Sequence, residues 1–289
     1  MGLSVRVIDN FSVGRPENVP AEAELIQGDI LNPAAIEKAV AGCDVVFHLA
    51  ARVAIRSSFD FVVEDTATNF AGTASVCRAT LRSGSARKII STSSMAVYSD
   101  AATPDPLSET HPTEPVSPYG LSKLGAERLT HMLAAGTGVD SVVLRLFNTY
   151  GPGQTYSPYV GVVTIFVNKL RNGEAATVFG DGEQARDFVH VEDVVSAFVC
   201  AMEASVTGET CNIGTGRATT VNDVYKIVSS YMGVDRNPEH CPAVAGELRY
   251  SIADIAKARR ILHYEPQHRF EASIGAVIDE IMLQSKAAK

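Results

Sequence analysis

Two residues that could carry proton chemistry stand four positions apart, Tyr119 and Lys123 in the segment YGLSK. In a helix, a spacing of four places both side chains on one face. A tyrosine hydroxyl titrates near ~10, so a proton-accepting phenolate at neutral pH needs roughly 4 kcal/mol of stabilisation. A lysine ammonium in a dry cleft supplies part of that stabilisation. The pair therefore indicates a site that transfers a proton.

Ser94 is the hydroxyl donor expected beside the tyrosine, because it closely follows the buried apolar run at 88–90. Each residue also has an ordinary interpretation. The pattern Tyr-x-x-x-Lys occurs by chance in many helices, and a serine after a strand is often only a turn residue. The assignment therefore depends on the elements that would position the three side chains.

Short β-rich runs alternate with longer segments of helical periodicity, the pattern of parallel strands joined by crossover helices. Strands are predicted at 5–8, 24–27, 45–48, 88–90 and 142–145. Each ends in small or polar residues, where an open α/β sheet builds its ligand site. Helices are predicted at 33–41, 61–84, 118–136 and 191–203, and the second and third close on glycine. The fold class is therefore α/β.

The chain of 289 residues is long enough for one large or two modest domains. After Gly151 the sequence becomes rich in proline, glycine and tyrosine, a composition that indicates loops. We therefore expect a first domain over 1–150 and a smaller substrate lobe over 151–289. The apolar helix near 191–204 is expected to return to the first domain.

Composition excludes several classes of protein. The 25 Lys+Arg against 33 Asp+Glu give a net charge of -8 without a basic run, so nucleic acid is not an expected partner. The five cysteines are scattered, with no C-x-x-C spacing, so neither a disulfide framework nor a zinc site is expected and a reducing cytoplasm fits best. No run reaches the ~18 to 20 apolar residues that cross a bilayer, and no signal pattern is found.

Several motifs occur in one order along nearly the whole chain. They are DN at 9–10, GDI at 28–30, HLAA at 48–51, NFAGT at 69–73, SSMAVY at 93–98, the Tyr119/Lys123 pair, RLFNTYGP at 145–152, RDFVHV at 186–191 and NIG at 212–214. In this order the sequence resembles the extended short-chain dehydrogenase/reductase family, and within it the sugar-nucleotide epimerases and dehydratases related to UDP-glucose 4-epimerase. The resemblance implies an enzyme with a Rossmann-type doubly wound parallel sheet, a smaller C-terminal substrate lobe and NAD as cofactor.

The resemblance assigns the adenosine end of NAD to residues that follow the first two predicted strands. Asp9, followed by Asn10, would hold the ribose hydroxyls, which favours NAD over NADP because a carboxylate repels a 2′-phosphate. Asp29 and Ile30 would flank the adenine. Outside this ordered set of motifs, the two aspartates would be ordinary turn or cap residues.

The rest of the cofactor would meet residues later in the chain. By resemblance, Ala50 and Ala51 would line the path of the pyrophosphate and ribose, and Asn69 belongs to the same set. Lys123 would hold the nicotinamide ribose beside Tyr119. The oxidised nicotinamide ring would also add a second positive charge near the phenol.

The front of the dinucleotide fold is missing from the sequence. A glycine-rich turn is expected ~20 residues before the ribose acid, and with Asp9 as that acid the turn would lie before Met1. The segment Gly214-Thr215-Gly216 lacks a third glycine and is no substitute. Because the missing strand is central in this topology, we expect the sheet to open between its neighbours and the chain to hold NAD weakly.

The residues after Ser94 separate the reactions of this family. By resemblance, dehydratases carry an Asp-Glu pair there and decarboxylases a glutamate at the second position, whereas this chain has Met95-Ala96. Epimerisation through transient oxidation at sugar C4 is therefore favoured, with Tyr119 as base and Ser94 bonded to the developing oxygen. A 4-keto reductase, a dehydratase of the same family and a catalytically impaired NAD-sensing or interaction protein are the alternatives.

The second lobe is expected to hold a UDP- or dTDP-linked sugar. By resemblance Asn148 and Arg186 would meet the diphosphate, because arginine offers a fork suited to phosphate; the plain alternative for Arg186 is a salt bridge with Asp187 or Glu183. Arg249 and Ser251 are the other expected substrate contacts.

Two departures from the family pattern and two further resemblances bear on the substrate and the assembly. Ser251 stands where glucose-restricted epimerases carry a bulky tyrosine, so room for an N-acetyl group is expected. The family motif R-P-G-D is replaced by VAGE at 244–247, and the loop 157–162 resembles that of dTDP-sugar epimerases, so the base stays open. By resemblance alone, the helices at 61–84 and 118–136 would pair across a two-fold axis in a homodimer.

Overall fold

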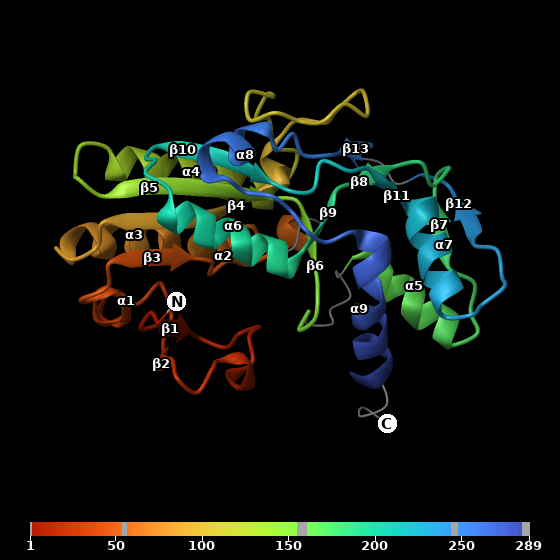
Figure 1. Ribbon diagram of the computed structural model, residues 1–289, viewed down its shortest axis with the longest axis horizontal. Coiled ribbons are helices and arrows are strands. Elements are labelled where there is room, and N and C mark those ends of the chain that lie inside the picture. Colours follow the sequence, from red (N-terminus) through yellow and green to blue (C-terminus); the bar gives the residue numbers. More distant parts are fainter. Residues whose placement is uncertain (1, 54–56, 155–160, 244–247, 285–289) are drawn as a thin grey trace. The chain divides into compact units, whose positions relative to one another are not determined.

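Figure 1 shows a computed structural model of the protein, which describes residues 2–53, 57–154, 161–243 and 248–284. The chain divides into two compact units. The first comprises Met1–Ser99, Pro112–Arg145 and Phe198–Cys211, and the second Asp100–His111, Leu146–Ala197 and Asn212–Lys289. The prediction assigned residues 100–111 to the first domain, but they belong to the second unit. The reason is local: the Leu107 main chain exchanges hydrogen bonds with Ile252 and Asp254 at 2.7 and 2.9 Å.

The first unit is built on parallel β-structure. Its main sheet has the order β10-β5-β4-β3, formed by Glu209–Ile213, Asp140–Leu146, Lys88–Ser94 and Val45–His48. A separate parallel pair joins β1 (Arg6–Asp9) to β2 (Glu24–Gln27). Among the described residues β1 and β3 do not pair, so the sheet is open at the place where the sequence predicted an opening.

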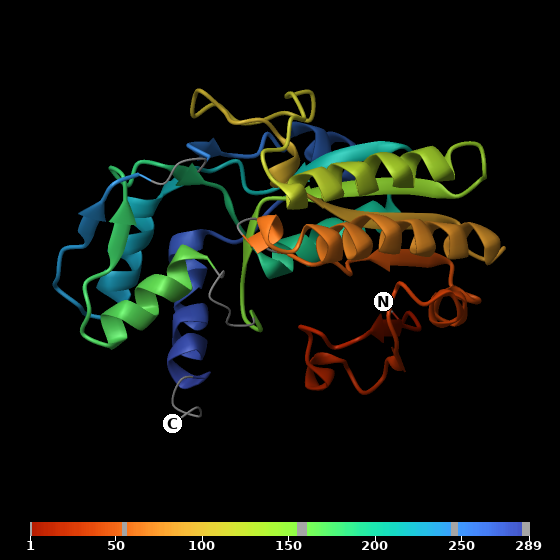
Figure 2. The ribbon, with the colours of Figure 1, turned by 180° about the vertical axis from the view of Figure 1, so that it is seen from behind.

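Helices accompany this sheet in the predicted order. They are α1 (Pro33–Val40), α2 (Val62–Thr66), α3 (Thr73–Arg82) and α4 (Pro118–Ala134), and single 3₁₀ turns occur at Pro16–Asn18, Ser57–Phe59 and Met95–Val97. Figure 2 shows α3 (orange) and α4 (yellow-green) side by side. Ile36, Val76 and Ile89 are buried between α1, α3 and the sheet, so the apolar faces of these elements form a common core.

The helix predicted over 61–84 is not continuous. A π-helical segment, Ala67–Gly72, separates α2 from α3. Such wide turns often occur at functional sites, because they redirect side chains that a regular helix would place elsewhere. Here the wide turn contains Asn69, one of the residues predicted to serve the cofactor.

The second unit has a helical core and several short strands. The helices α5 (Val162–Arg171), α7 (Val221–Tyr231) and α9 (Phe270–Gln284) bury Phe166, Val224 and Ile274 among themselves. The strand groups are β6-β9 (Asn148–Tyr150 and Phe188–His190), β12-β7 (Glu239–Cys241 and Thr177–Phe179) and β11-β8-β13 (Thr219–Thr220, Ala185–Arg186 and Tyr250–Ser251). The remaining helices are α6 (Val191–Glu203) and α8 (Ala256–Leu262).

Helix α6 belongs to both units. Its first residues lie in the second unit, and from Phe198 onward it belongs to the first, where Phe198 packs edge-on against Phe47 of β3. The buried ammonium of Lys88 donates to the carbonyls of Ala201 and Met202, so it caps the end of the helix. In the described parts of the chain, no helix combines the length and apolar character that crossing a membrane requires.

Candidate active site

The structure brings Ser94 and Tyr119 together. Ser94 is the last residue of β4, and its hydroxyl is hydrogen-bonded to the phenol of Tyr119 near the start of α4. The Ser94 oxygen accepts a bond of 3.2 Å from the Ala96 N–H, which leaves its own proton free to point at the phenol. A serine that donates to a tyrosine oxygen is arranged to assist that oxygen when it loses its proton.

Lys123 lies one turn further along α4, on the same face as Tyr119. Both side chains are only 4% exposed, and the lysine ammonium donates a long bond of 3.4 Å to Thr92 Oγ1 of β4. Thr92 and Ser94 are two positions apart on one strand, so their side chains leave the same face of the sheet. The tyrosine, the lysine and the serine are therefore held against one short stretch of β4.

A close approach of main chains fixes the start of α4. Helix α4 begins at Pro118, and the hydroxyl of Ser117 caps it by accepting the Gly120 N–H at 3.1 Å. A Cβ atom at Gly120 would lie 2.2 Å from the Ala96 carbonyl oxygen, so this position has no room for a side chain. Glycine here lets the helix rest directly on the turn that follows Ser94.

Burial sets the protonation states of the pair. It raises the pKa of Tyr119 to about 12, an effect that the bond from Ser94 opposes and the charge of Asp65 reinforces. Burial also lowers the pKa of Lys123 to about 8, with the charge of Glu127 opposing. At neutral pH the phenol is therefore protonated and the lysine largely charged. A further positive charge is needed to form the phenolate, and an oxidised nicotinamide ring would supply one.

Glu127 is a residue that the motif comparison alone did not identify. It lies one turn beyond Lys123 and is itself buried, with its two oxygens 3.0 and 2.5 Å from the guanidinium of Arg145. Arg145 also donates to the Tyr98 hydroxyl at 2.8 Å. The carboxylate of Glu127, paired with Arg145, places a negative charge close to the Lys123 ammonium. The i, i+4 spacing to Lys123 was the available sequence signal.

Asn69 is held entirely within the protein. Its amide oxygen accepts the Arg52 N–H at 2.8 Å, and its amide nitrogen donates to the Arg52 carbonyl and to Ser122 Oγ, both at 3.1 Å. Ser122 in turn donates to the Tyr119 carbonyl at 2.8 Å. The structure thus shows Asn69 linking the loop after β3 to the first turn of α4, a positioning contact, and its contact with the cofactor stays a prediction.

Three predicted cofactor residues form a polar cluster after β1 and β2. Asp9 ends β1 and accepts the Phe11 N–H at 2.7 Å. The Asn10 amide donates to Asp29 Oδ2 at 2.9 Å, and Asp29 Oδ1 accepts the Leu31 N–H at 2.8 Å. Because β1 and β2 are parallel, these residues meet at one edge, and the two carboxylates offer further acceptor positions for hydroxyl groups.

The other predicted cofactor residues are apolar. The side chain of Ile30 is buried against Gly72, where a Cβ atom would lie 2.4 Å from Ile30 Cδ1, so only its main chain is available to a ligand. Ala50 is exposed and Ala51 is half-buried in the segment after β3. Small residues at the end of a strand leave space for a ligand to approach the main chain.

Two predicted substrate residues of the second unit have buried polar atoms that lack partners. Within the described residues, Asn148 Oδ1 and Ser251 Oγ have no hydrogen-bond partner, and Ser251 is 0% exposed. Asn148 is on β6, and Ser251 on β13 stands opposite Arg186 of β8. Since buried polar atoms are usually satisfied, these two are candidates for a ligand or ordered water.

The two predicted arginines are bonded to the protein. Arg186 donates to the carbonyls of Ala185, Leu248 and Arg249 at 2.9, 2.7 and 3.3 Å. Arg249 makes a two-point ion pair with Asp181 at 2.8 and 2.7 Å. Both would have to exchange these partners to meet a diphosphate. The VAGE motif at 244–247 and residues 157–160 of the predicted loop lie outside the described residues.

The parallel sheet defines an α/β protein of the Rossmann type, in which Ser94, Tyr119 and Lys123 lie together beside β4. The model of the NAD dependent epimerase/dehydratase family matches residues 1–214. The chain belongs to this family of enzymes, and the predicted family, fold class and cofactor are confirmed.

Relatives of known name are similar over nearly their whole length. UDP-glucose 4-epimerase from Mycolicibacterium smegmatis is 32% identical over 96% of this chain and 90% of its own. The structure of UDP-glucose 4-epimerase from Thermotoga maritima with UDP-glucose has a TM-score of 0.91 at 34% identity, covering 98% and 92% of the two chains.

The relatives do not share one substrate or one reaction. UDP-N-acetylglucosamine 4-epimerase from Methanobrevibacter ruminantium, in complex with UDP-N-acetylmuramic acid, has a TM-score of 0.90 at 29% identity over 97% and 91% of the chains. Other relatives are named as decarboxylases. The reaction must therefore be inferred from the residues of this chain.

Proposed function

We propose that the protein is an NAD-dependent 4-epimerase of nucleotide-linked hexoses. The observation that carries the proposal is the turn after Ser94. The serine bonded to Tyr119 is followed by Met95 and Ala96, both buried, so this turn offers no carboxylate. Elimination of water and loss of carbon dioxide both use extra acid or base groups, whereas epimerisation at C4 uses the tyrosine alone.

Asp65 is the acidic residue whose charge acts on Tyr119, and its environment supports the same proposal. It is buried in α2 and accepts a bond of 2.8 Å from Arg52 Nε. The ion pair engages one carboxylate oxygen of Asp65 with Arg52 rather than with the phenol. Asp65 therefore contributes charge near the phenol and is poorly suited to serve as a second base.

The donor set of the first unit fits the cofactor of the family. Asp9 and Asp29 offer carboxylate oxygens to ribose hydroxyls, Ala50 and Ala51 leave the main chain accessible, and Lys123 offers an ammonium. When bound there, NAD would supply the hydride-accepting and hydride-donating chemistry that epimerisation at C4 requires.

The protein residues move and hold the proton. Tyr119 takes the proton of the C4 hydroxyl while Ser94 donates to the same oxygen. Lys123 stabilises the phenolate by its charge, and Glu127 keeps the lysine protonated in spite of burial. Returning the proton from Tyr119 to the sugar oxygen completes the cycle, so the protein is restored without an external acid.

A UDP-linked hexose or N-acetylhexosamine is the substrate that we propose. Relatives named for UDP-glucose and for UDP-N-acetylglucosamine support both sugars. A serine at position 251 is much smaller than the tyrosine that the resemblance associates with restriction to glucose. Its unpartnered hydroxyl, together with Asn148 Oδ1, would gain a partner from a polar sugar or diphosphate.

An assay of the two sugars at equal concentration tests this function. We expect UDP-glucose and UDP-N-acetylglucosamine both to be converted to their 4-epimers, with NAD present only in catalytic amount and no net change in reduced cofactor. Chromatography identifies the products, and the Tyr119→Phe variant measures the background rate of conversion. Conversion of UDP-glucose alone would contradict the proposal that a UDP-N-acetylhexosamine is also a substrate. A parallel reaction that supplies reduced cofactor and a 4-keto nucleotide sugar would identify a reductase instead if it consumed the cofactor.

A homodimer is part of the proposal. Large apolar side chains are exposed in and around the segments that the resemblance assigns to the dimer contact. They are Phe59, Phe61, Val62, Val63, Phe70, Leu121 and Met132. A second copy covering these residues would remove them from water, which is the usual fate of such a patch.

A further inference from the structure

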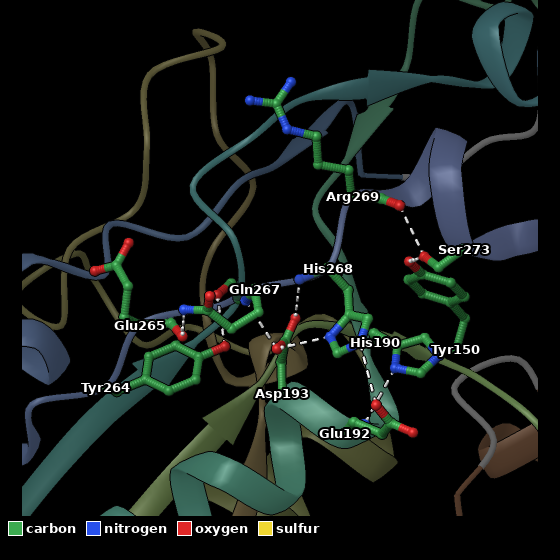
Figure 3. Close-up of polar contacts among 11 residues, drawn as sticks. Tyr150, His190, Glu192, Asp193, Tyr264, Glu265, Gln267, His268, Arg269 and Ser273 are labelled. Atoms are coloured by element: carbon green, nitrogen blue, oxygen red, sulfur yellow. Dashed lines mark hydrogen bonds and ion pairs between the residues drawn. The ribbon is translucent and has the colours of Figure 1, made fainter.

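A cluster of two histidines and a glutamate lies in the second unit and consists of residues that have no assigned role in the reaction. His190 ends β9, Glu192 stands in the first turn of α6, and His268 lies two residues before α9. One ligand atom from each side chain lies within 4.8 Å of the others. Figure 3 shows the three side chains converging, with Asp193 on the far side of His268.

The contact between His268 and Glu192 is the tightest in the cluster. His268 Nε2 lies 3.1 Å from Glu192 Oε2. In a tetrahedral zinc site with bonds of about 2.0–2.2 Å, ligand atoms stand roughly 3.3 Å apart. These two atoms are therefore already at the separation that a shared metal ion requires. The glutamate side chain is 71% exposed, so it can adjust without disturbing the core.

Asp193 fixes the orientation of His268 from the side of the ring opposite Glu192. This carboxylate is 2% exposed, accepts the main-chain N–H groups of Gln267 and His268 at 2.9 and 3.0 Å, and lies 2.9 Å from His268 Nδ1. Because Nδ1 donates to Asp193, Nε2 faces Glu192. A carboxylate that holds the distal nitrogen of a metal-binding histidine is a recurrent arrangement, since it sets the tautomer and strengthens the ligand.

The arrangement needs a positive centre between Nε2 of His268 and the Glu192 carboxylate. A neutral His268 would direct a lone pair at the carboxylate, which is repulsive. Either a proton or a metal ion at this position resolves the repulsion. His190, which is buried, is the third potential donor. A neutral imidazole has the lone pair that a metal ion uses.

We propose that His190, Glu192 and His268 bind a divalent first-row transition metal ion, with Zn²⁺ as the best match. Two imidazoles and one carboxylate suit zinc, cobalt and nickel, whereas Mg²⁺ and Ca²⁺ prefer oxygen ligands alone. Three protein ligands leave a fourth position for water. The ion would tie the start of α6 to the segment before α9, residues 75 or more positions apart in sequence.

Binding requires a small rearrangement. The two imidazole rings are stacked, with centroids 4.3 Å apart and an angle of 26° between their planes. The nitrogen lone pairs of the two rings therefore lie in nearly parallel planes and do not point at one common position. Rotation of the His190 ring about χ2 brings its donor toward the Glu192 carboxylate, and this torsion has a broad, shallow profile. The Glu192 N–H, 3.3 Å from His190 Nδ1, makes only a weak bond that opposes the rotation.

Titration of the full-length protein with Co²⁺ and Zn²⁺ tests the proposal. We expect about one equivalent of Co²⁺ to bind with the visible absorption of a low-coordinate nitrogen and oxygen site, Zn²⁺ to displace it, and Zn²⁺ to raise Tm where Mg²⁺ does not. Absence of a spectrum, of binding heat and of a Tm shift would mean that the cluster is an ordinary protonated ion pair, and would overturn the proposal.

Two variants test whether the metal ion binds at these residues. His268→Asn retains an amide donor for Asp193 but removes the ligand atom, and Glu192→Gln changes a largely exposed side chain that folding does not need. Each should weaken Co²⁺ binding by more than the ~10–100-fold that loss of a supporting contact costs. The matched control is His263→Asn, an exposed histidine in a left-handed position that asparagine tolerates. Equal binding by all three proteins would contradict the proposal.

Discussion

Tyr119→Phe is expected to lower kcat by about 10²–10⁴-fold, the contribution of a positioned proton-transfer group. The substitution deletes one oxygen and keeps the buried ring, so the protein should stay folded. Ser94 loses its partner but still accepts the Ala96 N–H. Asp65 and Glu127, the described carboxylates whose charges act on Tyr119 and Lys123, are both held in ion pairs, so the proposed mechanism gives the C4 hydroxyl proton to Tyr119.

Initial rates and fluorescence-detected NAD binding check this expectation. Tyr231→Phe is the matched control, since it removes an equivalent hydroxyl from a half-exposed residue whose partner is Asp279. We expect the control to keep its rate and both variants to bind NAD about equally. A Tyr119→Phe protein with undiminished kcat would show that the proton leaves by another route.

Lys123→Met is expected to abolish most activity and, at pH 7, to stabilise the protein. A lysine that is 4% exposed and whose pKa falls to about 8 destabilises the folded state when it is charged, by about 1–3 kcal/mol. Methionine fills similar space without a charge. Glu127 keeps its partner Arg145, so removing the lysine leaves no unpaired carboxylate. A gain in stability with a loss of turnover is typical of a functional group.

The pH dependence of this stability difference has a definite sign. Because the folded-state pKa of Lys123 is depressed, the unfolded chain binds the extra proton between about pH 8 and the ordinary value of 10.5. The destabilisation of the wild-type protein is therefore complete below pH 8 and fades as pH rises through this window. Urea unfolding of both proteins at pH 7 and near pH 10 measures it. A stability difference that grew with pH would contradict the assignment.

Periodicity predicted the elements that carry the site, because their apolar patterns are long and regular. The strands at 24–27 and 45–48 and the helix at 191–203 have the predicted limits. Strand β4 runs further than predicted, to Ser94, because its polar end is paired within the sheet and buried. The π-helical interruption at Ala67–Gly72 was missed, since it depends on tertiary bonds made by Asn69.

Side-chain roles were less predictable than element positions. Ordered motifs identified Ser94, Tyr119 and Lys123 as one group, and the structure places them against the same strand. The same motifs could not show that the Asn69 side chain is hydrogen-bonded to Arg52 and Ser122, because hydrogen-bond partners distant in sequence leave no local signal. The cluster of His190, Glu192 and His268 was missed for the same reason.

In the proposed reaction, hydride leaves C4 of the sugar and returns to the same carbon on the other face. Enzyme supplied with NAD, without reduced cofactor, would be given a UDP-hexose carrying deuterium at C4, and the products examined by mass spectrometry and NMR. The proposed mechanism predicts that the 4-epimer keeps its deuterium at C4 in full, in ordinary water. Loss of the label to solvent, or its appearance at another carbon, would contradict this mechanism.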